Sequence, residues 1–240
     1  MSVDSAGFPE PMISNHRGTR GGPTPERQAA LDSAILEFGK RSFSEKGVGR
    51  TSMEEVSTQL GVSKHTVYRR HPSKLALLKA VLLKDVDDSH ETSLKNEITE
   101  SPEGARRLLL GYVHGEIRRL SSNLYKRVEV EAVGVEEVKN LLICCAARAE
   151  DFVRKPLENG YLVRAGDPFY PKHLSEVAVD MLQGLVRRAM LGRLSGPDIE
   201  AAFEVRWQVL SALTEKTFSS GQRPLPAPFP SESEECSGAV

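Results

Sequence analysis

The sequence has few of the features that mark secreted, membrane-spanning or metal-binding proteins. Only three of its 240 residues are cysteines, which is too few for a disulfide framework. Cys144 and Cys145 are adjacent and have no histidine nearby, so we interpret them as small apolar core residues; a redox or metal role is the alternative. Cys236 is expected to be exposed. No apolar run approaches the ~18 residues of a membrane helix.

Other absences bear on localisation and function. Residues 1–24 contain no apolar block of the kind found in a secretory signal, so the expected compartment is the cytoplasm. The chain has no Gly-x-Ser-x-Gly, His-Glu-x-x-His, phosphate-binding loop or dinucleotide fingerprint. His90 and Glu91 begin a metalloprotease pattern, but its second histidine is missing. We therefore predict that the protein is not an enzyme and uses no metal or cofactor, with a catalytic helical protein as the competing class.

The net charge of −1 conceals an uneven distribution. Residues 16–84 contain 13 lysines and arginines against 6 acidic residues, a net charge of +7. Residues 89–218 contain 18 basic residues against 19 acidic ones. Positive charge gathered in one segment is the electrostatic signature of a nucleic-acid-binding region. The nearly neutral remainder suits a domain with a different role.

Residues 52–71 are predicted to form two short helices joined by a tight turn. Ser52 and Glu55 have the spacing of a capping box, in which each side chain bonds the backbone N–H of the other. Met53, Val56, Ser57 and Leu60 then recur at helical spacing. Gly61 can end this helix, because it adopts the left-handed conformation at little cost.

The second helix of the pair has the composition of a helix that enters the major groove of DNA. Ser63 can cap its start, Val67 is its expected buried anchor, and Pro72 disfavours a helical residue before it. The rest of its surface is polar or cationic and consists of Lys64, His65, Thr66, Tyr68, Arg69 and Arg70. Such a helix fits a groove about 12 Å wide. An ordinary structural pair of helices is the alternative.

Elsewhere the apolar residues recur at helical spacing, and strand-like alternation is absent. A first long helix is expected from Pro25 to the residue before Gly47, with an inward face of Leu31, Ile35, Phe38, Gly39, Ser42 and Phe43. Further helices are expected from Ser73 and over 102–120, 123–133, 136–158, 173–191 and from 197 onward. The predicted division is an arm at 1–24, helical domains at 25–88 and 89–218, and a tail at 219–240. The arm and the tail are expected to be disordered.

Residues 26–88 resemble the DNA-binding domain of the tetracycline-repressor (TetR-like) family of bacterial transcription regulators. The matching runs follow in order and without gaps: Phe43-Ser-Glu-Lys-Gly47, Thr51-Ser-Met-Glu-Glu-Val, Leu60-Gly-Val-Ser-Lys64, Thr66-Val-Tyr68 and Pro72-Ser-Lys74. The resemblance implies an all-α protein, with an N-terminal three-helix helix-turn-helix DNA-binding domain followed by a helical ligand-binding and dimerisation domain. It also implies a homodimer on a palindromic operator in double-stranded DNA, most simply a repressor released by a small-molecule effector. An architectural or protein-partnered DNA-binding regulator without a small-molecule ligand is the alternative.

The resemblance also assigns DNA contacts. Ser52 would bring backbone amides to a phosphate, Tyr68 would bond a phosphate, and Lys74 would meet the DNA backbone. Base edges would be read from the start of the second helix, where His65 replaces the small residue more usual in the family. The full predicted DNA-binding set is Ser52, Ser63, Lys64, His65, Thr66, Tyr68, Arg69 and Lys74. Gly39 and Ser42 are smaller than the family's usual residues, which predicts looser packing around the first helix.

For the second domain the resemblance implies a pocket among the middle helices and a dimer formed by the last two. Candidate pocket residues are Tyr112, His114, Tyr125, Phe152 and Tyr161, for each of which an ordinary core or surface role is the alternative. Leu182, Val186 and Met190 add apolar groups beyond those that a single core contact requires, as expected of a dimer helix. The basic residues His16, Arg17 and Arg20 of the arm either follow the DNA backbone or belong to an inert tail.

Overall fold

The computed structural model describes residues 24–94, 101–159 and 169–219, and these ranges contain nine α-helices and no strand. The helices are α1 (Pro25–Lys46), α2 (Met53–Gln59), α3 (Lys64–Arg70), α4 (Lys74–Leu94), α5 (Pro102–Leu120), α6 (Asn123–Ala132), α7 (Glu136–Asn159), α8 (Phe169–Met190) and α9 (Gly196–Ser219). The predicted all-α fold is therefore confirmed. Residues 1–23 of the predicted arm and 220–240 of the predicted tail, which include Cys236, lie outside the described residues.

Helix α8 begins at Phe169, four residues before the start predicted at residue 173. Pro171 occupies the first turn of this helix, where a backbone N–H has no partner within the helix and proline is tolerated.

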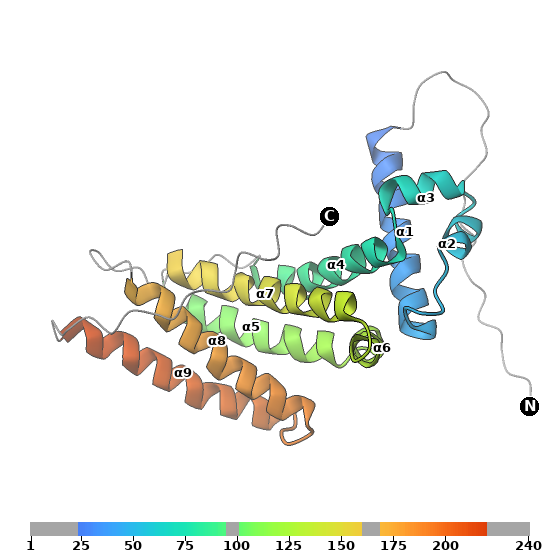
Figure 1. Cartoon of the computed structure of the whole chain (residues 1–240). Coiled ribbons are helices and arrows are strands. Elements are labelled where there is room, and N and C mark those ends of the chain that lie inside the picture. Colours follow the sequence, from blue (N-terminus) through green and yellow to red (C-terminus); the bar gives the residue numbers. More distant parts are fainter. Residues whose placement is uncertain (1–23, 95–100, 160–168, 220–240) are drawn as a thin grey trace, which may run out of the picture.

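Helices α1, α2 and α3 form a head at one end of the molecule, and α4 leads from the head into the remaining helices (Figure 1). Helix α1 ends at Gly47, whose φ of 81° lies in the left-handed region. Gly61 has a φ of 63° and makes the turn between α2 and α3, as predicted. Val67 is fully buried and anchors α3 to the head. The two glycines therefore mark the helix ends at which the sequence predicted them.

The start of α2 differs from the predicted capping box. The hydroxyl oxygen of Ser52 accepts a hydrogen bond from the backbone N–H of Glu54 (3.2 Å). The same hydroxyl group donates a hydrogen bond to the Glu54 carboxylate (2.9 Å). Glu55 instead forms an ion pair with Lys46 at the end of α1. A charged ammonium group is a stronger partner for a carboxylate than a neutral backbone amide, so Glu55 turns toward α1.

The packing of α1 on α4 is tight, where looser packing was predicted. A Cβ atom added at Gly39 would meet Val81 at 3.2 Å and Leu77 at 3.3 Å. Ser42 is buried, and its hydroxyl lies 3.2 Å from that of Thr51. Gly39 therefore allows α4 to approach α1 closely, and Ser42 packs against the loop between α1 and α2.

Helix α4 connects the head to the rest of the chain, since it packs on α1 at one end and on α5 and α7 further along. Its buried side chains belong to one continuous hydrophobic cluster that reaches from α1 to α9. The predicted domain boundary after residue 88 falls inside this helix. The division into two domains therefore remains a prediction.

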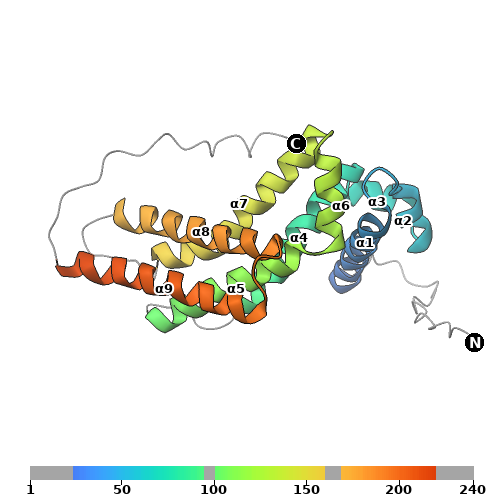
Figure 2. The ribbon, with the colours of Figure 1, turned by 90° about the horizontal axis from the view of Figure 1, so that it is seen from below.

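Helices α5 to α9 make up the second part of the molecule, with α8 and α9 side by side along its outer edge (Figures 1 and 2). Leu182 and Val186 are 3% and 5% exposed, so the prediction that they add apolar surface for a second subunit is wrong. They pack into the chain's own core, whereas Met190 is exposed. Cys145 is buried, which raises its pKa to about 11 and suits an inert core residue.

Candidate nucleic-acid interface

The solvent-exposed face of helix α3 is polar and cationic. Lys64, His65 and Arg69 are exposed, and Tyr68 is 37% exposed. The N-cap Ser63 accepts the backbone N–H of Thr66 (3.1 Å), and the two hydroxyl groups lie 2.8 Å apart. The helix is therefore fixed at its start by this cap and anchored to the head by Val67, while its polar side chains lie on the exposed side.

Two further cations, Arg70 at the end of α3 and Lys74 at the start of α4, are held by contacts within the protein. Arg70 forms an ion pair with Asp32 of α1 and donates to the backbone oxygen of Thr66 (3.2 Å). The Lys74 ammonium donates to the backbone oxygen of Gly49 (3.0 Å). The ion pair of Arg70 therefore connects α3 to α1. Lys74, a predicted DNA contact, is hydrogen-bonded to the loop between α1 and α2.

The predicted set omits Glu54, which contacts three of its members. The Glu54 carboxylate accepts hydrogen bonds from the Ser52 hydroxyl at 2.9 Å and the Tyr68 hydroxyl at 3.4 Å, and it lies 3.6 Å from the Lys64 ammonium. The hydrogen bond from Ser52 lowers the pKa of Glu54, with further help from its own backbone N–H and from Lys64. Partial burial and the adjacent carboxylate raise the pKa of Tyr68. An acidic residue within a basic segment was the available signal in the sequence.

Three of the candidate pocket residues come together around buried charges. Tyr112 stacks on His90 with ring centroids 5.5 Å apart, and Phe152 lies 5.3 Å from the same ring. The Arg119 guanidinium lies 4.5 Å from the ring of Tyr125. His114 is exposed on the surface of α5 and is not part of this group, and Tyr161 lies outside the described residues.

The charged residues at the centre of this group were not predicted. Glu116 and Arg119 are 6% and 3% exposed and share two hydrogen bonds, of 2.8 and 2.6 Å, while His90 Nε2 lies 3.0 Å from Glu116. Burial alone would raise the pKa of Glu116, but the hydrogen bonds from His90 and Arg119 outweigh it and the pKa is lowered. Glu116 follows Tyr112 by one helical turn, within the apolar stripe of α5. That charged interruption of the stripe could have revealed it.

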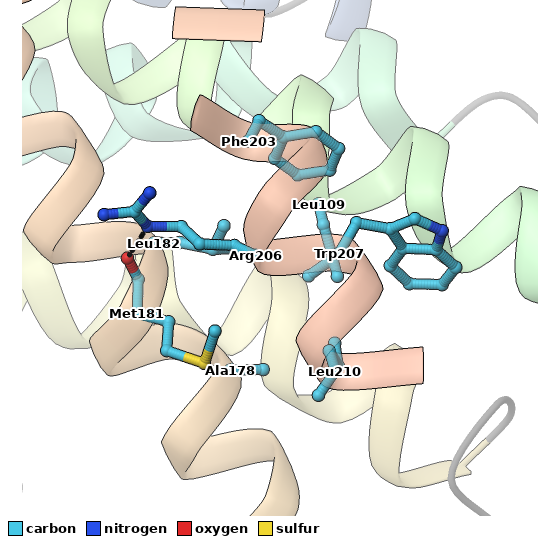
Figure 3. A pocket seen from close by; sticks show the side chains of 8 residues that line it. All are labelled: Leu109, Ala178, Met181, Leu182, Phe203, Arg206, Trp207 and Leu210. Carbon is cyan, nitrogen blue, oxygen red and sulfur yellow. Dashed lines mark hydrogen bonds between the residues drawn. The ribbon is translucent and has the colours of Figure 1, made fainter. Parts of the chain in front are cut away.

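Two hollows lie elsewhere on the described part of the molecule. The cleft between α5, α8 and α9 is lined by Leu109, Ala178, Met181, Leu182, Phe203, Arg206, Trp207 and Leu210 (Figure 3). It holds only about 10 Å³, room for roughly one water molecule. A surface hollow of about 340 Å³ lies between the end of α1 and helix α6. Within the described ranges, no cluster of three His, Cys, Asp or Glu side chains is arranged to hold a metal ion.

Comparison with known proteins matches residues 35–81 to the family model of bacterial regulatory proteins of the tetR family. These residues run from α1 through α2 and α3 into α4. The head is a TetR-family domain. The chain is 28% identical over 118 residues to the HTH-type transcriptional regulator TtgR of Pseudomonas putida, covering 44% of this chain and 54% of TtgR. It is 34% identical over 87 residues to the HTH-type transcriptional activator FasR of Mycolicibacterium smegmatis, covering 36% of this chain and 37% of FasR.

These matches span about half of TtgR and little more than a third of FasR, whereas the structural likeness extends further. A solved structure from Mesorhizobium loti, described as a TetR-family transcriptional regulator, superimposes with a TM-score of 0.56 at 22% identity. It covers 78% of this chain and 98% of that chain. At this identity the likeness establishes the fold of the helices beyond the TetR-family head. Among the described residues, no helix has the length and apolar character required to span a bilayer.

Proposed function

We propose that the protein is a sequence-specific DNA-binding transcription regulator that acts in the cytoplasm and has no enzymatic activity. The observation that carries the proposal is the exposed face of α3. It presents Lys64, His65 and Tyr68 from a short helix whose only buried side chain is Val67. The TetR-family match of the head and its net positive charge support the same conclusion.

In this proposal the contacts divide by chemistry. Lys64, His65 and Thr66 lie at the start of α3 and face base edges, which carry sequence information. Ser52, Tyr68 and Lys74 carry hydroxyl or ammonium donors suited to phosphate oxygens. Ser63 fixes the first turn of α3, and Arg69 adds positive charge on the exposed side.

We further propose that the regulator is a homodimer that reads a palindromic operator. Its outer helices expose apolar side chains: Val177 and Met190 on α8, and Val205 and Val209 on α9. Val205 is 60% exposed and Val209 is 47% exposed, one turn apart on the same helix. A second copy that covers them would place two heads on one duplex, and reading successive major grooves requires a separation of about 34 Å.

A small-molecule effector is proposed to release the protein from DNA by binding among the middle helices, near Tyr112, Tyr125 and Phe152. These side chains surround His90 of α4 and the buried Arg119 of α5, and α4 leads directly to the head. An effector needs only about 1–3 kcal/mol of differential affinity to change DNA binding substantially. The alternative is an architectural or protein-partnered DNA-binding regulator without a small-molecule ligand, and the cleft of Figure 3, at about 10 Å³, has no room for an effector.

Selection of bound sequences from random duplex DNA, at two salt concentrations, tests the central proposal. A palindrome with half-sites about one helical turn apart would support the dimeric reader. Salt-sensitive binding without sequence preference would favour an architectural role, and an absence of binding would overturn the proposal. A reporter gene placed behind the selected site would then distinguish repression from activation. Melting-temperature shifts across lipophilic and aromatic compounds would separate the two candidates for regulation.

A further inference from the structure

On the exposed surface of the head, three hydrogen-bond or ion-pair donors point at one acidic side chain. Ser52 precedes α2, whereas Lys64 and Tyr68 lie on different turns of α3. All three direct a hydroxyl or ammonium group at the Glu54 carboxylate, at 2.9, 3.6 and 3.4 Å respectively. One carboxylate therefore occupies the space where donors from two helices meet.

The chemistry of this group is that of a phosphate site. A phosphodiester, like a carboxylate, presents anionic oxygens that accept short, charge-assisted hydrogen bonds from hydroxyl and ammonium donors. The side chain of Glu54 is 50% exposed, so its own packing does not hold it in place. Glu54 can leave when a stronger or better-placed anion arrives.

We propose that Ser52, Lys64 and Tyr68 form a seat for one DNA phosphate, which Glu54 fills as an internal anion in the free protein. The proposal rests on the proposed DNA-binding function and deepens it. Glu54 is then an affinity-determining residue, because every duplex that binds must displace its carboxylate from the three donors. It also shields the charge of Lys64 before DNA arrives, which reduces the attraction to any polyanion.

Removing the charge of Glu54 has two expected consequences. The Glu54→Gln variant binds DNA about two- to fivefold more tightly per head, the range expected for loss of one exposed competing ion pair. This gain is the same for the selected operator and for unrelated duplexes, because a phosphate carries no sequence information. The dependence of affinity on salt also steepens by up to about one unit of log–log slope per head, since Lys64 now neutralises a phosphate unassisted.

Glu55→Gln provides a matched control. It removes the same charge from the same helix, but the ion-pair partner of Glu55 is Lys46 of α1 instead of a donor on α3. Affinity and salt slope are to be measured by fluorescence anisotropy for the full chain and both variants, on the operator and on a scrambled duplex. Glu55→Gln is expected to stay within about twofold of the natural chain. Both side chains lie at the surface, so melting temperatures should differ little.

A double variant tests whether the effect passes through the seat. Glu54→Gln should gain less affinity in a Tyr68→Phe background, because one of the donors released by the substitution is then missing. Unchanged or weaker binding by Glu54→Gln would overturn the proposal, and so would an equal gain from Glu55→Gln. A natural chain that binds no duplex would overturn the proposed function and the seat with it.

Discussion

At the scale of single residues, His65 is the side chain most characteristic of this chain's proposed base reading. It is exposed on the first turn of α3, beside Lys64. We expect His65→Ala to change the preference at one base step by about 1–3 kcal/mol and to leave the other positions of the operator unaffected. Competition of single-base operator variants against the selected sequence measures this change.

Tyr68→Phe should behave differently, because the hydroxyl group is proposed to bond a phosphate. We expect weaker binding to every duplex by a similar factor, with no change in the ranking of sequences. The same set of operator variants checks this expectation. If His65→Ala and Tyr68→Phe both act equally on all sequences, the base-reading role of His65 is wrong.

Glu116 is expected to contribute to the stability of the folded chain. Glu116→Gln would leave the buried Arg119 guanidinium without its charged partner, and we expect a loss of about 3 kcal/mol in the free energy of unfolding at pH 7. Glu103→Gln, on the exposed start of the same helix, should cost less than about 1 kcal/mol. Urea denaturation of both variants measures the difference, and equal losses would contradict the assignment.

The same carboxylate predicts a pH dependence. The pKa of Glu116 is lowered in the folded chain from its ordinary value of 4.5. Its contribution to stability is therefore fully present above about pH 4.5 and is lost as the pH falls through the lower, folded pKa. The gap in stability between the natural chain and Glu116→Gln should narrow below about pH 4.5. A gap that stays constant down to about pH 3 would show that Glu116 is not the titrating group.

At the scale of elements, α6 holds the loop between α1 and α2. Glu131 accepts the backbone N–H of Val48 at 2.6 Å and that of Gly49 at 3.0 Å, and Arg127 donates to the backbone oxygen of Ser44 at 3.2 Å. A side chain at Gly47 would collide with Glu131, since an added Cβ would lie 2.5 Å from its carboxylate oxygen. This contact connects the second part of the molecule to the loop that precedes Ser52.

Glu131→Ala should release that loop. The Val48 and Gly49 amides lose their acceptor, and we expect a loss of about 1–3 kcal/mol in local stability. Amide hydrogen exchange at these two residues should accelerate, whereas Glu129→Ala, on the exposed side of the same helix, should leave it unchanged. Unaltered exchange at Val48 in the Glu131 variant would show that the loop holds its conformation without α6.

Contacts between residues close in sequence could be predicted from the sequence, whereas contacts between helices could not. Gly47, Gly61 and Ser63 act on residues within four positions of themselves, so local spacing was enough to place the ends of α1, α2 and α3. Glu131 meets Val48 across 83 positions, and Glu54 meets Tyr68 across 14. Such pairs depend on how helices pack, which periodicity does not describe.

At the scale of the whole molecule, the hydrophobic cluster passes from the head through α4 to the outer helices without interruption. Periodicity placed Leu182 and Val186 on an apolar face of α8, but it could not distinguish a face buried within the chain from one left for a second copy. The structure assigns both residues to the chain's own core and leaves other apolar side chains exposed on α9. The proposed dimer therefore depends on a narrower surface than the sequence suggested.

Substitution of the exposed valines on α9 tests the proposed dimer. Val205 and Val209 are exposed one turn apart, and carboxylates in their place could not be buried against a second copy without a large desolvation cost. We expect the double variant Val205→Glu, Val209→Glu to remain folded but to become monomeric in analytical ultracentrifugation. Affinity for the full palindrome should then fall to that for a single half-site, because two heads on one duplex bind far more tightly than one. Val133→Glu changes an even more exposed valine at the end of α6 and should alter neither property. A double variant that stays dimeric would place the interface elsewhere, while the reading of bases by α3 would stand unaffected.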